Sequence, residues 1–184
     1  MQDFANGDAK AFECLYDRHA LGSWRFILRS VRVQALADDL AQDVWFAVAR
    51  AAANYEPRAK FRTWLFTIAH NTVVDHFRAV RPTVSLDAPV DGAGTEAALD
   101  YAQELHANSG FGPLRRLESK EQAMAFLAAI AELPAEQRDA FLLQAEAGMD
   151  LAEIAAATGV SFETAKSRLR YARKRLRERL QEFA

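Results

Sequence analysis

Residues 150–177, DLAEIAAATGVSFETAKSRLRYARKRLR, decide the fold of the segment around them. Residues 150–157 predict a short helix, and residues 158–160 (Thr-Gly-Val) predict a turn, because glycine adopts a positive φ without strain. Ser161 is a suitable N-cap for a second helix that extends to about Phe183. Two helices joined by such a turn are typical of a helix-turn-helix.

The second helix of this pattern has two different faces. Its apolar residues lie within about 60° of one another and predict a packed face: Ala165, Leu169, Ala172 and Leu176. The rest is cationic, since residues 166–179 contain 8 basic residues and one acid, Glu178. A basic run alone is more often a solvated surface, but on a helix-turn-helix it favours DNA binding. Candidates for base edges are Glu163, Lys166, Ser167 and Arg170, and candidates for phosphates are Arg173, Lys174 and Arg177.

The remaining periodicity predicts an all-α fold without an alternating strand. Asp8 is a suitable N-cap for the first helix, and Gly22 marks a candidate bend in it. Helices are expected over about 8–31, 37–54, 60–79, 118–133 and 134–147. The inward residues of the second helix would be Leu40, Val44, Ala47, Val48 and Ala51, and those of the third Phe61, Leu65, Ile68 and Thr72.

Composition limits the class of protein. The chain has 184 residues, 51% of them hydrophobic, and a formal net charge of −2. Its single cysteine, Cys14, excludes an internal disulfide framework and a cysteine-based zinc site. No signal peptide and no apolar run near 18 residues are evident, so we expect a cytoplasmic protein without membrane insertion. The small net charge does not exclude nucleic acid, because binding depends on where the charge lies.

Residues 82–117 predict a flexible acidic linker. They contain 2 Lys/Arg against 5 Asp/Glu, and they combine Pro and Gly with small polar residues without a sustained period. A short helix over 96–106 is compatible with the spacing of its apolar residues. We therefore expect two small helical domains, residues 1–81 and residues 118–184.

Three carboxylates, Asp38, Asp39 and Asp43, open the second expected helix. The helix dipole favours negative charge at this end and is sufficient to explain them. A protein-docking surface is the other interpretation, and the residues alone give it equal weight. A metal site is less favoured, because no histidine or further acid is evident nearby to complete a coordination shell.

Aromatic and basic residues are interleaved over 54–66 (NYEPRAKFRTWLF). Aromatic rings can stack on unpaired bases while Arg and Lys hold the backbone. Most of these rings, Phe61 among them, are expected in the core. Tyr55, in a loop with a proline, and Asn71, on the polar side of the next helix, are better candidates for base contact, because an amide can pair with a base edge.

Patterns of catalytic chemistry are absent from the sequence. It contains no Gly-rich phosphate loop, no zinc-type histidine pair and no nucleophile elbow. His70 and His76 lie about 120° apart on one helix, which is unsuitable for sharing a metal. We expect no enzyme activity, no metal and no cofactor.

Five segments together resemble the extracytoplasmic-function (ECF) class of bacterial RNA polymerase sigma factors, in the sigma-70 superfamily. They are GDAKAF (7–12), LYDRH (15–19), ADDLAQDVW (37–45), FRTWLFTIAHN (61–71) and LP (133–134), followed by the helix-turn-helix. Their order and spacing cover nearly the whole chain. The resemblance implies two helical domains, σ2 and σ4, joined by a linker with no σ3 domain between them.

The resemblance also implies partners and contact residues. The clamp helices of the polymerase β′ subunit would dock on Asp38, Asp39, Leu40, Gln42 and Asp43, and the flap of the β subunit on σ4. The melted non-template strand of the promoter −10 element would bind Tyr55, Arg58, Lys60, Trp64 and Asn71. The −35 duplex would bind Glu163, Lys166, Ser167, Arg170, Tyr171, Arg173 and Lys174, although the family often has a basic residue at Tyr171.

The resemblance further implies that the linker passes through the polymerase active-site cleft and that an anti-sigma factor is a candidate partner. Two other function classes stay open on the residues alone. A conventional helix-turn-helix regulator would bind its operator as a dimer without polymerase. A polymerase adaptor would need the acidic helix but not Arg170. Dependence of specific DNA binding on core enzyme distinguishes the sigma factor from the regulator.

Overall fold

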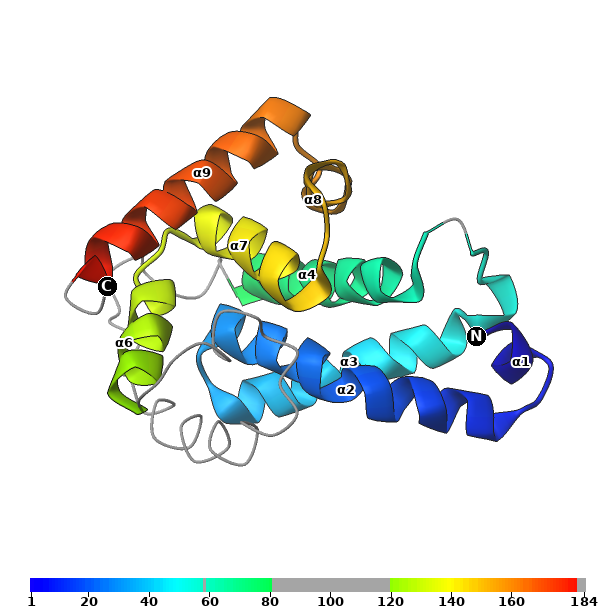
Figure 1. Ribbon diagram of the computed structural model, residues 1–184. Coiled ribbons are helices and arrows are strands. Elements are labelled where there is room, and N and C mark those ends of the chain that lie inside the picture. The colour runs from blue at the N-terminus through cyan, green and yellow to red at the C-terminus, as the bar shows by residue number, and fades with distance from the viewer. Residues whose placement is uncertain (58, 81–119, 182–184) are drawn as a thin grey trace. The chain divides into compact units, whose positions relative to one another are not determined.

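The computed structural model describes residues 1–57, 59–80 and 120–181 (Figure 1). All regular elements in these ranges are helices, which confirms the all-α class. The chain divides into two compact units, Met1–Ala93 and Gly94–Ala184. The expected linker and its short helix lie outside the described residues, so the domain boundaries at 81 and 118 stay predictions. None of the described helices is long and apolar enough to cross a membrane.

The N-terminal unit is built on three helices that pack against one another, α2, α3 and α4. The predicted N-cap Asp8 is confirmed, because its carboxylate accepts a hydrogen bond from the Lys10 amide at 2.9 Å. A short helix that the sequence did not predict, α1, packs against α2. The bounds are α1 Gln2–Ala5, α2 Ala9–Val31, α3 Gln34–Arg50, the 3₁₀ helix η1 Ala52–Asn54 and α4 Phe61–Val80.

A tight apolar core joins α2 to α4. The rings of Phe26 and Phe66 meet edge to face at a centroid distance of 5.6 Å, and both are fully buried. Helix α2 continues through Gly22 as one α-helix, so the candidate bend there does not interrupt it. A Cβ at Gly22 would lie 3.7 Å from Phe66 Cζ, which is ordinary contact.

The inward face of α4 is rotated from the predicted one. Of the four residues expected inside, only Leu65 is buried, whereas Phe61, Ile68 and Thr72 are half-buried. Helix α4 carries apolar residues on more than one face, so its pattern did not decide the rotation. The residues that it buries are Thr63, Leu65, Phe66, Ala69, His70 and Val73.

The C-terminal unit has helix ends that match the sequence prediction closely. Gly148 and Gly159 end two helices in the left-handed conformation, with φ of 64° and 66°. Asp150 forms a capping box with Glu153, and Ser161 caps the last helix by accepting the Thr164 amide at 3.2 Å. The bounds are α6 Lys120–Ala131, α7 Ala135–Ala147, α8 Leu151–Thr158 and α9 Phe162–Arg179.

Helix α9 is the element around which this unit packs, since α6, α7 and α8 all contact it. The predicted inward stripe is confirmed. Ala165 and Ala172 have no exposed surface, and Leu169 and Leu176 are at most 5% exposed. Alanine at these positions permits close approach of α7, whose Leu142 and Leu143 are also fully buried.

Asp139 on α7 is an acidic residue in a mostly buried position. Burial raises its pKa from 3.8 to about 6, although the Arg138 and Arg168 guanidinium groups oppose the shift. The folded state therefore binds this proton more tightly than the unfolded chain does. As pH rises from about 4 through about 6, the folded protein has to carry a poorly solvated carboxylate, and the free energy of unfolding falls.

We therefore expect Asp139→Asn to be more stable than the wild type at pH 7.5, by about 3 kcal/mol, because each pKa unit corresponds to about 1.4 kcal/mol. At pH 4 the two proteins should unfold at nearly the same temperature, since Asp139 is then protonated. Scanning calorimetry of the full chain at both pH values measures the difference. An identical pH dependence in the two proteins would contradict the assignment.

Candidate nucleic-acid interface

The exposed side of α9 lies opposite its buried stripe. At 100° per residue, its centre lies about 160° from the centre of the stripe. Of the four residues on this side, Glu163, Arg170 and Lys174 are exposed and Ser167 is half-buried. We call this surface the exposed arc of α9; its residues, within about 60° of one another, are Glu163, Ser167, Arg170 and Lys174. Lys166 and Tyr171, also predicted to contact DNA, are exposed at its two edges.

Among the described residues, the ion pairs of the exposed arc are all made within α9. Lys166 Nζ lies 3.5 Å from Glu163 Oε1, and Lys174 Nζ lies 3.7 Å from Glu178 Oε1. Such exposed pairs contribute little and exchange readily for other partners. Arg170 lies over the ring of Tyr171, with Cζ 4.9 Å from the centroid, and its Nη2 donates to the tyrosine oxygen at 3.3 Å.

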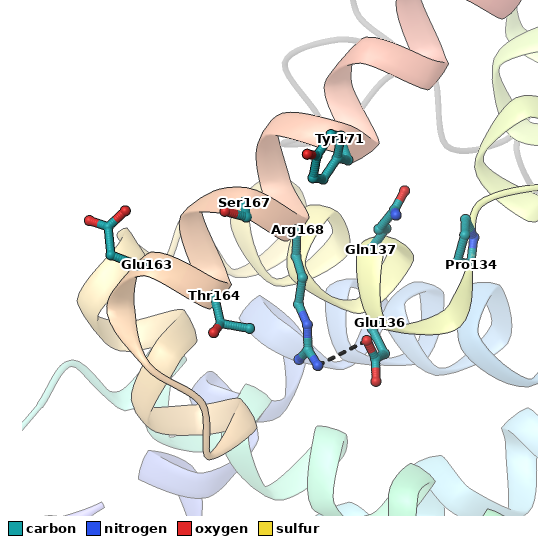
Figure 2. A pocket seen from close by; sticks show the side chains of 8 residues that line it. All are labelled: Pro134, Glu136, Gln137, Glu163, Thr164, Ser167, Arg168 and Tyr171. Atoms are coloured by element: carbon teal, nitrogen blue, oxygen red, sulfur yellow. Dashed lines mark ion pairs between the residues drawn. The ribbon is translucent and has the colours of Figure 1, made fainter.

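Three other arginines of α9 are bonded to side chains of α7 and of the turn between α6 and α7. Arg168 pairs with Glu136 at 2.9 Å (Figure 2). Arg179 pairs with Glu132 at 2.6 Å, and Arg173 Nη2 donates to Gln144 Oε1 at 2.6 Å. These contacts orient α9 on the unit. The sequence did not predict them, because the partners are far apart along the chain; for Arg173 and Gln144 the separation is 29 residues.

An open pocket of about 380 Å³ lies between the start of α7 and the first half of α9. The Glu136–Arg168 ion pair lies on one side of it, and the Glu163 carboxylate points away from that pair (Figure 2). Ser167 and Tyr171 of the predicted DNA contacts also line it, so the pocket borders the exposed arc. Its lining residues are Pro134, Glu136, Gln137, Glu163, Thr164, Ser167, Arg168 and Tyr171.

An aromatic cluster lies where α2, α4 and the segment before α4 meet. The ring of Tyr55 contacts that of Trp64 at a centroid distance of 4.8 Å, and Phe61 contacts Trp64 at 5.8 Å. His19 from α2 completes the cluster, 5.3 Å from Phe61. All four side chains are half-buried. Sequence reasoning did not assign His19 to this cluster, since its contact with Phe61 joins two separate helices.

The pKa of His19 is lowered, first by burial and then by the positive charges of Arg62 and Arg18. The imidazole therefore favours its neutral form more strongly than a free histidine does. Arg62 and Arg18 thus place two positive charges near the aromatic cluster. The surroundings of the cluster thus combine ring surfaces with positive charge, as a site for unpaired bases requires.

Two other predicted −10 contacts, Lys60 and Asn71, are exposed on α4 or just before it. Asn71 is exposed on α4, seven residues after Trp64, so the two lie about 20° apart in rotation and about 10 Å apart along the helix. Lys60 is exposed just before α4. Arg58 lies outside the described residues.

Helix α3 begins at Gln34, three residues before the expected start, so no acid lies in its first turn and the helix dipole does not explain its carboxylates. The acidic stretch of α3, residues 38–43, divides into surface and core residues. Asp39, Gln42 and Asp43 are exposed. Asp38 is also exposed, and its carboxylate accepts a hydrogen bond from Trp24 Nε1 at 2.7 Å. Leu40 is only 6% exposed and faces the helical core, so its side chain is unsuited to direct contact with a partner. Among the described residues, no group of three His, Cys, Asp or Glu side chains could hold a metal ion.

Two families match separate parts of the chain. Residues 15–83 match Sigma-70 region 2, and residues 123–176 match Sigma-70, region 4. The RNA polymerase sigma factor CarQ of Myxococcus xanthus is 34% identical, with 100% of this chain and 97% of CarQ covered. The ECF RNA polymerase sigma factor SigC of Mycobacterium tuberculosis is 33% identical, with 92% of this chain and 83% of SigC covered.

Solved sigma factors share the fold. RpoE of Bartonella quintana, solved with the anti-sigma factor NepR, superposes with a TM-score of 0.66 at 23% identity, with 94% of this chain and 98% of RpoE covered. CnrH, solved with the cytosolic domain of CnrY, gives 0.63 at 23% identity, covering 98% and 94%. From the two family matches and these relatives, the chain belongs to the ECF class of sigma-70 factors, which are transcription initiation factors of RNA polymerase and not enzymes.

Proposed function

We propose that this sigma factor directs core RNA polymerase to promoters with two elements. The C-terminal unit would read the −35 element as duplex, and the N-terminal unit would bind the melted non-template strand of the −10 element. Residues 1–81 and 118–184 would form the two reading domains, joined by residues 82–117. The observation that carries the proposal is the exposed arc of α9, polar and mainly cationic, directly opposite a fully buried stripe.

The −35 proposal rests on the order of residues along α9. The N-terminal part of a recognition helix reaches base edges in the major groove, whereas more distal basic residues contact phosphates. Lys166, Ser167 and Arg170 are therefore assigned to bases, and Lys174 to phosphate. Arg173 can still contact phosphate while bonded to Gln144, because a guanidinium group has five donors.

The −10 proposal rests on the aromatic cluster and its surroundings. Extruding a base from a duplex costs a few kcal/mol, which stacking on rings must offset. Tyr55 and Trp64 supply ring surfaces that are half-exposed and held by contact with each other. Asn71 would pair with a base edge and Lys60 would hold the backbone. Arg58 enters this set through the family resemblance alone.

Docking on polymerase is assigned to the exposed carboxylates of α3, Asp39 and Asp43, together with Gln42. The clamp helices of β′ are the proposed partner here, and the β flap is the proposed partner of the C-terminal unit. Asp38 would contribute less, since its carboxylate already accepts the Trp24 hydrogen bond. The similar RpoE is solved with an anti-sigma factor, which makes such an inhibitor a candidate partner of this chain in the cytoplasm.

Run-off transcription with purified core polymerase on a pool of promoter fragments tests the proposed function. With this protein added, we expect initiation from fragments that share a motif with two elements. Core enzyme alone should not select that motif. If no transcript appears and the protein binds a specific duplex by itself, a conventional regulator is the correct function and the −10 assignments are wrong.

Arg170→Ala should weaken −35-dependent initiation by about 1 to 3 kcal/mol, or roughly 5- to 150-fold, through loss of a base contact. Arg175→Ala is the matched control, because it removes the same charge from an exposed position about 140° away around α9. Competition between promoters with intact and scrambled −35 elements measures the effect. Equal losses of selectivity in both variants would show that Arg170 acts through its positive charge alone and makes no base contact.

Asn71→Ala should change the base preference within the −10 element while leaving −35 preference intact. The physical reason is that an amide both donates to and accepts from a base edge, and alanine does neither. Permanganate footprinting and transcription from single-base −10 variants measure the change. An unaltered −10 preference would remove Asn71 from the proposed site.

A further inference from the structure

One side of helix α2 carries a run of arginines that the proposed base contacts do not use. From residue 18 to residue 37 the chain has four arginines and no acid. Three of them, Arg18, Arg25 and Arg29, lie within about 40° of one another around α2 and span about 16 Å along it. Both acids of α2 lie on other sides of the helix, about 100° or more from Arg18.

This run lies on the outer side of α2. Its centre is about 160° from the centre of the residues that α2 buries. Arg18 is exposed, and Arg25 and Arg29 are half-buried. Half-burial restricts a long side chain before it meets a ligand, so less conformational entropy is lost on binding.

A fourth arginine, Arg62 of α4, extends this cationic side. Its Cζ lies 6.0 Å from the centroid of the Phe66 ring, and Phe66 packs on Phe26 of α2. The charges of Arg62 and Arg18 both act on His19, so the two arginines lie near the same histidine. We call the four residues the α2 arginine surface: Arg18, Arg25, Arg29 and Arg62.

Helix α4 separates the α2 arginine surface from the proposed base contacts. Trp64 and Asn71 lie about 150° or more from the centre of the residues that α4 buries. Helix α2 packs on that buried side, through Phe66. A helix with its side chains is about 10 Å wide. A strand bound to Trp64 and Asn71 therefore lies on the other side of α4 from the arginines.

Melting a duplex leaves two charged backbones, and the base contacts on α4 account for only one of them. We propose that the α2 arginine surface binds the sugar–phosphate backbone of the template strand once the −10 element has melted. This inference rests on the proposed −10 function and adds the second strand to it. Helix α4 would then lie between the two separated strands.

The residue types suit a backbone contact. A guanidinium group binds phosphate oxygens through paired hydrogen bonds, and contacts to phosphate carry no sequence information. One strand of B-DNA has a phosphate about every 3.4 Å along the axis, so a surface about 16 Å long faces several phosphates. A template strand has to keep its bases free for pairing with nucleotides. Contacts to its backbone alone meet that requirement.

An acidic protein surface is the alternative occupant, since it has the same charge complementarity. Continuity with the aromatic cluster favours DNA. His19 belongs to that cluster and lies near both Arg18 and Arg62, so the arginine surface begins beside the proposed −10 site. The two occupants differ in what loss of the arginines changes, which is affinity for melted DNA in one case and affinity for a protein in the other.

Three double variants separate charge from structure. The first, Arg18→Gln with Arg29→Gln, removes two charges of the surface. The second, Arg18→Lys with Arg29→Lys, keeps both charges but loses the planar guanidinium, so it retains attraction for phosphate and gives up any bidentate bond within the fold. The matched control, Lys10→Gln with Arg50→Gln, removes two exposed charges elsewhere in the same unit.

The experiment uses holoenzyme assembled from core polymerase and the full chain. It binds two promoter fragments that are already melted over the −10 element, one with both strands and one that lacks the template strand across the melted region. Dissociation constants are measured over a range of salt concentrations. Affinity for core polymerase and thermal unfolding are measured for every variant.

On the complete fragment, the glutamine pair should bind about tenfold more weakly at physiological salt. The slope of log affinity against log salt should fall by about 1.4, at about 0.7 for each phosphate of a single strand. On the fragment without the template strand, the glutamine pair should bind like the wild type. The lysine pair and the control should stay close to the wild type on both fragments.

Equal losses on both fragments would overturn the template-strand contact, because the arginines would then hold the other strand or the duplex. A loss of affinity for core polymerase with unchanged DNA binding would overturn it in favour of a protein partner. If the glutamine pair does not fold, Arg18→Gln alone, at an exposed position, tests the same contact with about half the change in slope.

Failure of this inference is distinguishable from failure of the proposed function. If the wild type selects a two-element motif in run-off transcription and the glutamine pair binds both fragments normally, only the template-strand contact is wrong. If the wild type selects no such motif, the proposed function is wrong and the inference fails with it.

Discussion

The burial of one narrow stripe of α9 is the constraint on which the C-terminal unit depends. A helix with eight basic residues repels itself, and like charges three or four residues apart destabilise it. Tertiary packing compensates, because Ala165, Leu169, Ala172 and Leu176 leave almost no surface exposed. Small residues in this stripe also set the distance to α7. A larger side chain at Ala165 or Ala172 would displace the helix and with it every proposed −35 contact.

The polar contacts of α9 differ between the sides that pack on the unit and the exposed arc. On the sides that meet α6 and α7, arginines bind Glu132, Glu136 and Gln144, and these bonds orient the helix. On the exposed arc, the ion pairs found within the described part of the chain join neighbours of the same helix, and such weak pairs are easily exchanged. One residue type thus serves two purposes. Arg168 and Arg179 anchor the helix, Arg170 is proposed to read DNA, and Arg173 is assigned both roles.

The N-terminal unit combines two surfaces of opposite character on one small core. The first half of α3 carries exposed carboxylates, while the aromatic cluster joins α2 and α4 beside Arg18 and Arg62. The core between them is held by Phe26, Phe66 and other fully buried residues. A rigid core keeps the proposed docking and −10 surfaces separate. Opening DNA on one surface while holding polymerase with the other requires such a fixed arrangement.

The sequence by itself determined the helical class, the caps at Asp8 and Ser161, the turn at Gly159 and the buried stripe of α9. These features depend on local periodicity and on bonds between residues a few positions apart. Only the tertiary structure decided which face of α4 is buried and which arginines of α9 are bonded. Trp24 with Asp38, and Arg173 with Gln144, lie 14 and 29 residues apart. Such contacts follow from how neighbouring helices are oriented, and a single helical pattern does not contain that information.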